Sequence, residues 1–395
     1  MNIKFSKNIE ELTGTATREF LKLAYEPDII TLSGGLPSSD SFPLEEIKHI
    51  SKLVLDEFGT KALQYTITEG YEPLRHQIAE RMNRKNKTNV SKDEILLTCG
   101  SQQGLDFSGR VFIDSGDVII CESPTYTGAI NAFDVYNPTF VEIPTDENGM
   151  IMEELERVLE TTDNVKMIYV IPDFQNPTGV RWSIERRIKF MEIINKYEIP
   201  VIEDNPYSEL NFTGEVYPSL KSMDEKGLVI FLGTFSKILC PGYRIGWVCA
   251  PEEILKKYIY VKQRADLQSS TIAPIEISKF IELYDLDAHI ESVNELYKKR
   301  KDIMIKTMKE EFPPEVKYTN PDGGLFLWIE LPENLKATEL IKDCLKEKVA
   351  YMSGDSFFPN GGKLNYIRLN FSSNPEDKII EGIKKIGKVL REHIK

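Results

Sequence analysis

Short apolar runs alternate with stretches of helical periodicity along the middle of the chain. The apolar runs cover residues 95–99, 117–121, 139–143, 166–171, 199–203 and 228–232. Apolar residues with helical spacing lie between most of these runs, at 127–134, 151–161 and 183–197. Continuous apolar strands joined by crossover helices predict a largely parallel sheet with helices on both faces. Such sheets bind ligands at the carboxyl ends of their strands, so polar residues there are the first candidates for a site.

Different patterns flank this predicted sheet. Before it, the spacing of apolar residues predicts helices over about 8–26, 44–58 and 72–85 and a short strand at 29–33. After it, the spacing predicts one long charged helix over about 275–311, strands at 326–331 and 366–371, and a final helix over about 375–393. We therefore expect an α/β fold with a large domain and a smaller α+β domain. The expected boundaries are an N-terminal arm at 1–30, the large domain at 45–275, and the small domain at 31–44 and 276–395.

Composition narrows the class of protein. The chain has 395 residues, which suits two or three domains or one large and one small. It carries 49 Lys and Arg against 62 Asp and Glu, a formal charge of −13, which disfavours nucleic-acid binding because phosphate contacts need a basic face. The five cysteines show no CxxC spacing and the four histidines are scattered, so we expect reduced cysteines, a cytoplasmic location and no metal site. We expect neither a secretory leader nor a membrane helix, which needs roughly 18 apolar residues.

One lysine lies in an unusual place, in the stretch Gly233–Gly246 that follows the last apolar run. A lysine held in a partly desolvated pocket beside another cation loses its proton more easily and becomes a nucleophile. Arg244 would be such a neighbour of Lys237, and together with the hydroxyls of Thr234 and Ser236 it would suit one phosphate. A nucleophilic lysine beside a phosphate cup suggests pyridoxal phosphate (PLP). The alternative from this stretch alone is a surface turn with a solvated Lys and Arg.

Polar and aromatic residues follow the other predicted strands. Asp204 ends a buried strand, where a carboxylate is costly unless it is paired, and a protonated pyridine nitrogen would pair it. Ser101 begins a helix after a strand, a position that suits an anion. Tyr126 could stack on a planar ring, and Asn176 and Tyr207 could donate to its phenolic oxygen. Ser101, Tyr126 and Asn176 also have ordinary explanations, as a helix cap, a loop contact and a turn respectively. For Asp204 the competing role is that of a metal ligand, although no cluster of other ligands accompanies it.

An arginine in the C-terminal part of the chain completes the candidates. Arg368 lies within the apolar run 366–371. Its forked guanidinium could hold a carboxylate through two parallel hydrogen bonds. An internal salt bridge is an equally good explanation at this point.

The order of these motifs resembles the fold-type I PLP-dependent aminotransferases of class I/II, over essentially the whole chain. The motifs are Gly100–Gln103, Asn176–Gly179, Asp204–Tyr207, Thr234–Lys237, Pro241–Gly246 and Arg368–Phe371. The chain looks closest to the 2-aminoadipate and multi-substrate branch, whose pattern is also resembled by Ser33–Pro37, Gln64–Tyr65 and Thr68–Tyr71. This resemblance implies a large PLP-binding domain with a mostly parallel seven-stranded sheet flanked by helices, a smaller α+β domain, and a homodimer with shared active sites.

The resemblance also implies a role for each candidate residue. Lys237 would anchor PLP covalently and move the proton, Asp204 would pair with the pyridine nitrogen, and Tyr126 would stack on the ring. Asn176 and Tyr207 would hold the ring phenolate. The phosphate would be held by Ser101, Gln102, Thr234, Ser236, Arg244 and, from the other subunit, Tyr65. The substrate would be bound by Arg368, Gly35, Asn176 and, on the N-terminal arm, Arg18 and Thr15.

The expected activity is that of a PLP-dependent transaminase (EC 2.6.1.-). It would move an amino group from an L-amino acid (2-aminoadipate, glutamate, or an aromatic or branched-chain donor) to a 2-oxo acid such as 2-oxoglutarate by a ping-pong route. One alternative is another PLP reaction on the same fold, β-elimination or decarboxylation. The other is the PLP-binding sensing domain of a transcription regulator, which we disfavour because only about 30 residues precede Gly34, too few for a DNA reader.

Overall fold

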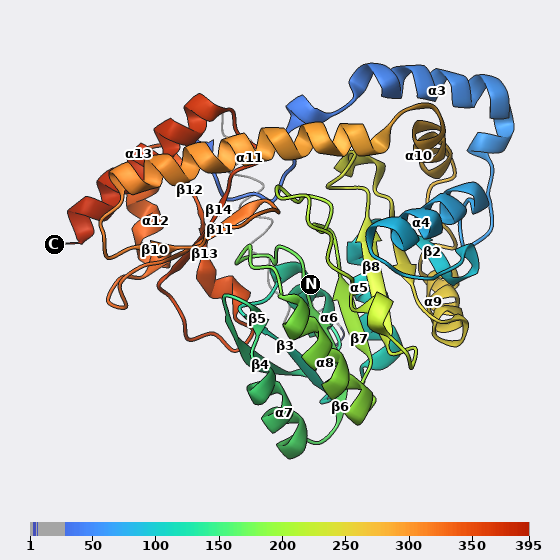
Figure 1. Cartoon of the computed structure of the whole chain (residues 1–395), viewed down its shortest axis with the longest axis horizontal. Coiled ribbons are helices and arrows are strands. Elements are labelled where there is room, and N and C mark those ends of the chain that lie inside the picture. Colours follow the sequence, from blue (N-terminus) through green and yellow to red (C-terminus); the bar gives the residue numbers. More distant parts are fainter. Residues whose placement is uncertain (1–2, 5, 7–27, 395) are drawn as a thin grey trace.

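The structure is a computed structural model that describes residues 3, 4, 6 and 28–394 (Figure 1). The expected helical arm over 8–26, with Thr15 and Arg18, lies outside the described residues. Two sheets and a long helix organise the described part. Helix α11 (Leu286–Glu311) runs along the top of the view, from the side of the large sheet to that of the small sheet (Figure 1).

The apolar runs in the middle of the chain form the large sheet. Within the described residues its strands, in spatial order, are β2 (Ile95–Thr98), β9 (Gly246–Cys249), β8 (Val229–Thr234), β7 (Val201–Asp204), β6 (Val165–Val170), β3 (Val118–Ser123), β4 (Thr139–Asp146) and β5 (Gly149–Met150). The strands from β8 to β4 are parallel to one another. Strands β9 and β5 run antiparallel to their neighbours. The expected mostly parallel sheet is confirmed, and the two-residue β5 adds an eighth strand to the seven expected.

Alternate residues of each strand pack on opposite faces of this sheet. In β6, Met167 and Tyr169 join the core that continues into the small domain, whereas Ile168 and Val170 pack with residues of α7 and α8. Both faces are therefore buried, which explains why the strands read as continuous apolar runs. The helices around the large sheet are α3 (Leu44–Phe58), α4 (Glu72–Lys85), α5 (Ser101–Phe112), α6 (Thr127–Asp134), α7 (Met152–Thr161), α8 (Ile184–Tyr197), α9 (Glu252–Ala265) and α10 (Ile272–Leu283).

The small domain carries a second, antiparallel sheet. Its strands, in spatial order, are β10 (Lys317–Tyr318), β11 (Phe326–Glu330), β14 (Tyr366–Asn370) and β13 (Met352–Ser353). Separate from it, β1 (Ile30–Thr31) pairs in parallel with β12 (Val349–Ala350). The remaining helices are α12 (Ala337–Lys346) and α13 (Glu376–His393), and α13 packs along α11. The pairing of β14 places Arg368 between Trp328 on one side and Met352 on the other.

The sequence-based expectation of one helix over 275–311 is wrong. Helix α10 ends at Leu283, and α11 begins at Leu286 after a break. The carboxylate of Asp285 accepts the backbone N–H of Ala288 at 3.0 Å, which caps the start of α11. A side-chain cap satisfies a backbone group that a continuous helix would bond internally, so Asp285 favours a new helix start here.

Three further observations concern membrane helices, cysteine pairing and metal ligands. None of the helices between residues 28 and 394 combines the length and apolar character that a membrane crossing requires. All five cysteines are unpaired, and Cys121, Cys249 and Cys344 are buried. The described residues hold no group of three or more His, Cys, Asp and Glu side chains arranged for a metal ion.

Candidate active site

A cavity of about 420 Å³ lies where the carboxyl ends of the parallel strands meet the small domain. Its lining includes nearly all of the expected site residues, namely Gly35, Ser101, Gln102, Tyr126, Asn176, Asp204, Tyr207, Thr234, Ser236, Lys237, Arg244 and Arg368. Residues separated by more than 300 positions are therefore brought to one place. Their roles stay predictions, but their proximity is a property of the fold.

Lys237 follows β8 and reaches the glycine-rich loop of the small domain. Its Nζ donates a hydrogen bond to the carbonyl oxygen of Gly35 at 2.8 Å. Burial and the positive charges of Arg368 and Arg244 lower the pKa of Lys237 to about 8, against the opposing effect of Asp204. A lysine with this pKa is neutral in a far larger fraction near pH 7 than an exposed one, and only the neutral amine is a nucleophile.

Asp204 ends β7 and is buried, with 2% of its surface exposed. Its Oδ2 accepts a hydrogen bond from the hydroxyl of Tyr169 at 2.8 Å, whereas its Oδ1 has no hydrogen-bond partner among the described residues. Burial raises the pKa of Asp204 to about 7, although the Tyr169 hydrogen bond and the charge of Lys237 act in the opposite direction. A buried carboxylate oxygen without a donor is costly, so this atom indicates a missing cationic or N–H partner.

A cup for an anion lies at the start of α5. The hydroxyl of Thr234 donates to Ser236 Oγ at 3.0 Å, and Arg244 Nη1 approaches the same oxygen at 3.4 Å. Gly100 has φ +69°, and a Cβ there would lie 2.5 Å from Arg244 Nη2. A Cβ at Gly246 would lie 2.6 Å from the backbone N of Ser101, so both glycines keep the cup open.

Gln102 also lies at this helix start. Its side-chain amide donates to the carbonyl oxygen of Gly128 at 2.8 Å and is therefore engaged in holding α6. The backbone N–H groups of the first turn remain for an anion, as at any helix start. A Cβ at Gly128 would lie 2.4 Å from Tyr126 Cζ, so glycine at this position makes room for the aromatic ring over the cavity.

Arg368 reaches the cavity from β14, with 5% of its surface exposed. Its Nη1 donates to Asn176 Oδ1 at 2.8 Å, its Nη2 donates to the carbonyl oxygen of Ser33 at 2.6 Å, and its Nε has no partner. The guanidinium lies 4.2 Å from the centre of the Phe326 ring. Burial lowers the pKa of Arg368 to about 10. No carboxylate of the described residues pairs with it, so the internal salt bridge is not observed and the charge is available for a bound carboxylate.

Tyr207 and Asn176 face the same space from different loops. Tyr207 is buried, and its ring meets Phe326 edge-on at 6.0 Å. Burial, more than any other influence, raises the pKa of Tyr207 far above its usual value, so its hydroxyl remains a donor. Because Asn176 Oδ1 is occupied by Arg368, the Asn176 amide nitrogen is the group left to donate into the cavity.

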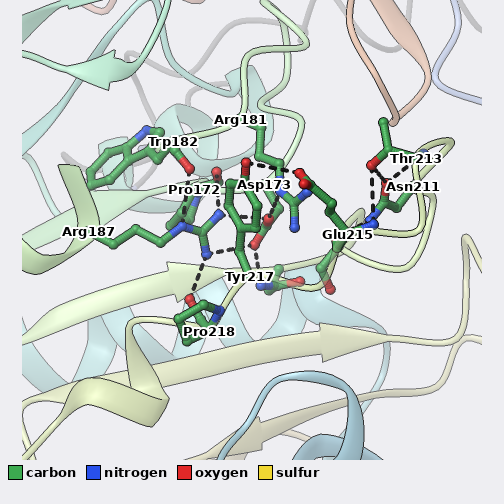
Figure 2. A network of polar contacts seen from close by, with 12 residues as sticks. Pro172, Asp173, Arg181, Trp182, Arg187, Asn211, Thr213, Glu215, Tyr217 and Pro218 are labelled. Carbon is green, nitrogen blue, oxygen red and sulfur yellow. Dashed lines mark hydrogen bonds and ion pairs between the residues drawn. The ribbon is translucent and has the colours of Figure 1, made fainter. Parts of the chain in front are cut away.

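The segment that carries Asn176 is held by a charged network that the sequence did not reveal. Figure 2 shows Arg187 and Arg181 converging on Asp173, three residues before Asn176. Arg187 Nη2 and Arg181 Nε donate to Asp173 Oδ1 at 2.7 and 3.0 Å, and Asn205 donates to Oδ2 at 3.2 Å. Burial alone would raise the pKa of Asp173, but the two arginines hold it below its usual value.

Tyr65 lies apart from the cavity lining. Its exposed fraction is 77%, and its neighbours Leu63 and Ile67 are exposed by 69% and 53%. Arg244, at the rim of the anion cup, is exposed as well. Tyr65 therefore contributes nothing to the cavity of its own chain, and Thr15 and Arg18 fall outside the described residues.

Comparisons with known proteins identify the family of this chain. A family model described as aminotransferase class I and II matches residues 27–386. Aromatic-amino-acid aminotransferase 1 of Thermococcus litoralis is 43% identical over 395 residues, covering 99% of this chain and 95% of the relative.

Two solved structures are similar over almost their whole length. The kynurenine aminotransferase of Pyrococcus horikoshii has a TM-score of 0.95 at 39% identity, covering 99% of this chain and 98% of that one. The α-aminoadipate aminotransferase of Thermus thermophilus, solved with N-(5'-phosphopyridoxyl)-L-leucine, has a TM-score of 0.92 at 36% identity, covering 98% and 97%. The chain described here thus belongs to the class I and II aminotransferases and is a PLP-dependent transaminase of fold type I.

Proposed function

We propose that this transaminase takes the amino group from an L-amino acid with an acidic or a large apolar side chain and passes it to a 2-oxo acid such as 2-oxoglutarate. The observation that carries the proposal is a buried Arg368 that has no carboxylate partner among the described residues, in the same cavity as a Lys237 of lowered pKa. Arg368 suits the α-carboxylate that every such donor and acceptor carries. Lys237 suits proton transfer at the adjacent carbon. The names of the similar proteins, which include aromatic, kynurenine and α-aminoadipate aminotransferases, support this range of donors.

The residues in the cavity fit PLP. The Thr234, Ser236 and Arg244 cup would hold its phosphate, and the unpartnered Oδ1 of Asp204 would accept the N–H of the pyridine ring. Tyr126 would cover the ring, and the donors of Asn176 and Tyr207 would reach its phenolic oxygen. When bound, PLP supplies an electron sink for the negative charge left on the substrate Cα after its proton is removed.

Each of these side chains then has a task toward the substrate or the proton. Arg368 orients the substrate through its carboxylate, with Asn176 and the Gly35 loop beside it. Lys237 takes the proton from Cα and returns it to a different carbon. The hydrogen bond of Lys237 to the Gly35 carbonyl, at 2.8 Å, keeps its amine on the side of the cavity that Arg368 shares. Arg18 and Thr15 are proposed to face the substrate side chain.

We also propose that the enzyme is a homodimer and that it is located in the cytoplasm. The exposed apolar side chains Leu63, Tyr65 and Ile67 form a surface that a second copy of the chain would cover. We propose that Tyr65 of each subunit reaches the phosphate bound by the other. The five unpaired cysteines fit a reducing compartment.

The test is a pair of half-reactions followed by the visible absorbance of the bound cofactor. Leucine, glutamate or 2-aminoadipate should convert the cofactor once, with one 2-oxo acid released per site, and 2-oxoglutarate should restore the starting spectrum. Release of ammonia together with an oxo acid would indicate β-elimination instead. Release of carbon dioxide would indicate decarboxylation.

A further inference from the structure

Tyr169 is buried on β6 beside the strand that ends in Asp204, and 1% of its surface is exposed. In the parallel pairing of β6 with β7, Tyr169 lies opposite Ile202. Successive side chains of a strand point to opposite faces, so Asp204, two residues after Ile202, projects on the same face as Tyr169. A side chain as long as tyrosine spans this diagonal, and its hydroxyl lies 2.8 Å from Asp204 Oδ2.

The ring of Tyr169 is fixed by its own packing. It meets the ring of Phe133 in α6 edge-on, with the ring centres 5.7 Å apart. Burial and the charge of Asp204 hold the pKa of Tyr169 well above its usual value, so the hydroxyl always carries its proton. A fixed donor of this kind can bond only one of the two carboxylate oxygens, and the other one, Oδ1, is left without a partner.

We infer that Tyr169 is a positioning residue, whose hydroxyl holds Oδ2 of Asp204 so that Oδ1 is the oxygen presented to the ring nitrogen of PLP. This rests on the proposed pairing of Asp204 with that nitrogen. Without the hydroxyl, the described residues offer Asp204 no hydrogen bond at all, and the carboxylate is free to rotate and to take up a proton. The other titratable groups that act on or are affected by Asp204 are Lys237, Tyr126 and Tyr207.

The test measures the affinity of the full-length apoenzyme for PLP in Tyr169→Phe, which keeps the ring and removes the hydroxyl. Loss of a hydrogen bond to a charged group raises the pKa of Asp204, by about one at the lower limit of such bonds. Since the Asp204 pKa is about 7, the charged fraction at pH 7 would fall from roughly one half to roughly one tenth. We expect about fivefold weaker PLP binding at pH 7, and a displacement of the pH dependence of binding toward higher pH.

Two controls separate positioning from a loss of structure. Tyr258→Phe removes another buried hydroxyl, which lies 2.8 Å from Ser108 Oγ, and should leave PLP affinity unchanged. The affinity for inorganic phosphate, a probe of the Thr234, Ser236 and Arg244 cup, should not change in Tyr169→Phe. In an Asp204→Ala background, Tyr169→Phe should add no further loss, because Tyr169 acts through Asp204.

The outcomes are distinguishable. Wild-type PLP affinity and pH dependence in Tyr169→Phe, with Asp204→Ala weakened, would overturn the inference and leave the proposed cofactor site standing. The inference would also be overturned if Tyr169→Phe weakened PLP binding as much in the Asp204→Ala background as it does in the wild-type enzyme. Wild-type affinity in Asp204→Ala itself would overturn both the pairing with the ring nitrogen and the role of Tyr169.

Discussion

Substitution of Arg368 by glutamine tests the binding of the substrate carboxylate most directly. Glutamine removes the charge but can still donate to Asn176 Oδ1, which otherwise would lose its partner at 2.8 Å. A hydrogen bond to a charged group contributes about 1.5–3 kcal/mol, so two from the forked guanidinium contribute about 3–6 kcal/mol. At 1.36 kcal/mol per tenfold, kcat/KM for leucine should fall by roughly 10²- to 10⁴-fold. The side chain is buried, so solvent screens these bonds little.

The assay compares leucine with 3-methylbutylamine, the same molecule without its carboxylate. Wild-type enzyme should prefer leucine strongly, and Arg368→Gln should lose most of that preference, because its loss of activity toward the amine should be much smaller than its loss toward leucine. Arg368→Lys, which keeps the charge but not the fork, should give an intermediate value. Equal losses on leucine and on the amine would refute the reasoning, because the substitution would then act on the cofactor rather than on the carboxylate.

Four further results are expected. Lys237→Ala should still bind PLP, but borohydride should no longer trap it on the protein, and turnover should fall by orders of magnitude. The rate at which the apoenzyme captures PLP should rise with pH and level off above about pH 8, because the neutral amine of Lys237 predominates only above its pKa. Arg18→Ala should lower kcat/KM for glutamate or 2-aminoadipate about ten- to a hundredfold and change that for leucine little, and equal losses would exclude Arg18 as the side-chain selector. Sedimentation at assay concentration should show a dimer, and an active monomer would contradict the role of Tyr65.

The sequence predicted the large sheet and its helices because both faces of its central strands are buried and the apolar runs of those strands are therefore continuous. It did not predict β9, a four-residue strand that begins at Gly246, the last residue of the stretch that contains Lys237. The break at Asp285 was missed because the apolar spacing continues on both sides of it, although an aspartate at a helix start is a known signal. The division into domains at about residue 276 stays a prediction.

The sequence predicted which residues belong to the candidate site better than it predicted the contacts between them. Strand ends and turn motifs are visible in one sequence, so Lys237, Asp204 and Asn176 could be chosen from local context. The bond from Tyr169 to Asp204 depends on the register between β6 and β7, and no single sequence specifies that register. The only sequence signal for this bond was a tyrosine within the apolar run next to the one that ends in Asp204, and such a tyrosine is ordinarily interpreted as a core residue.

The contact between Arg368 and Asn176 links a residue proposed to bind the substrate with one proposed to hold the cofactor. Arg368 comes from the small domain and binds the substrate, whereas Asn176 comes from the large domain and would hold the cofactor ring. Because Arg368 occupies Asn176 Oδ1, it determines which end of the amide faces the cavity, and its Nη2 bond to Ser33 at 2.6 Å ties the glycine-rich loop to the same point. A change at Arg368 must therefore affect both substrate and cofactor. The amine has no carboxylate, so its loss of kcat/KM in Arg368→Gln reports only the effect on the cofactor. The larger loss for leucine, compared with that for the amine, therefore isolates the contribution of the carboxylate.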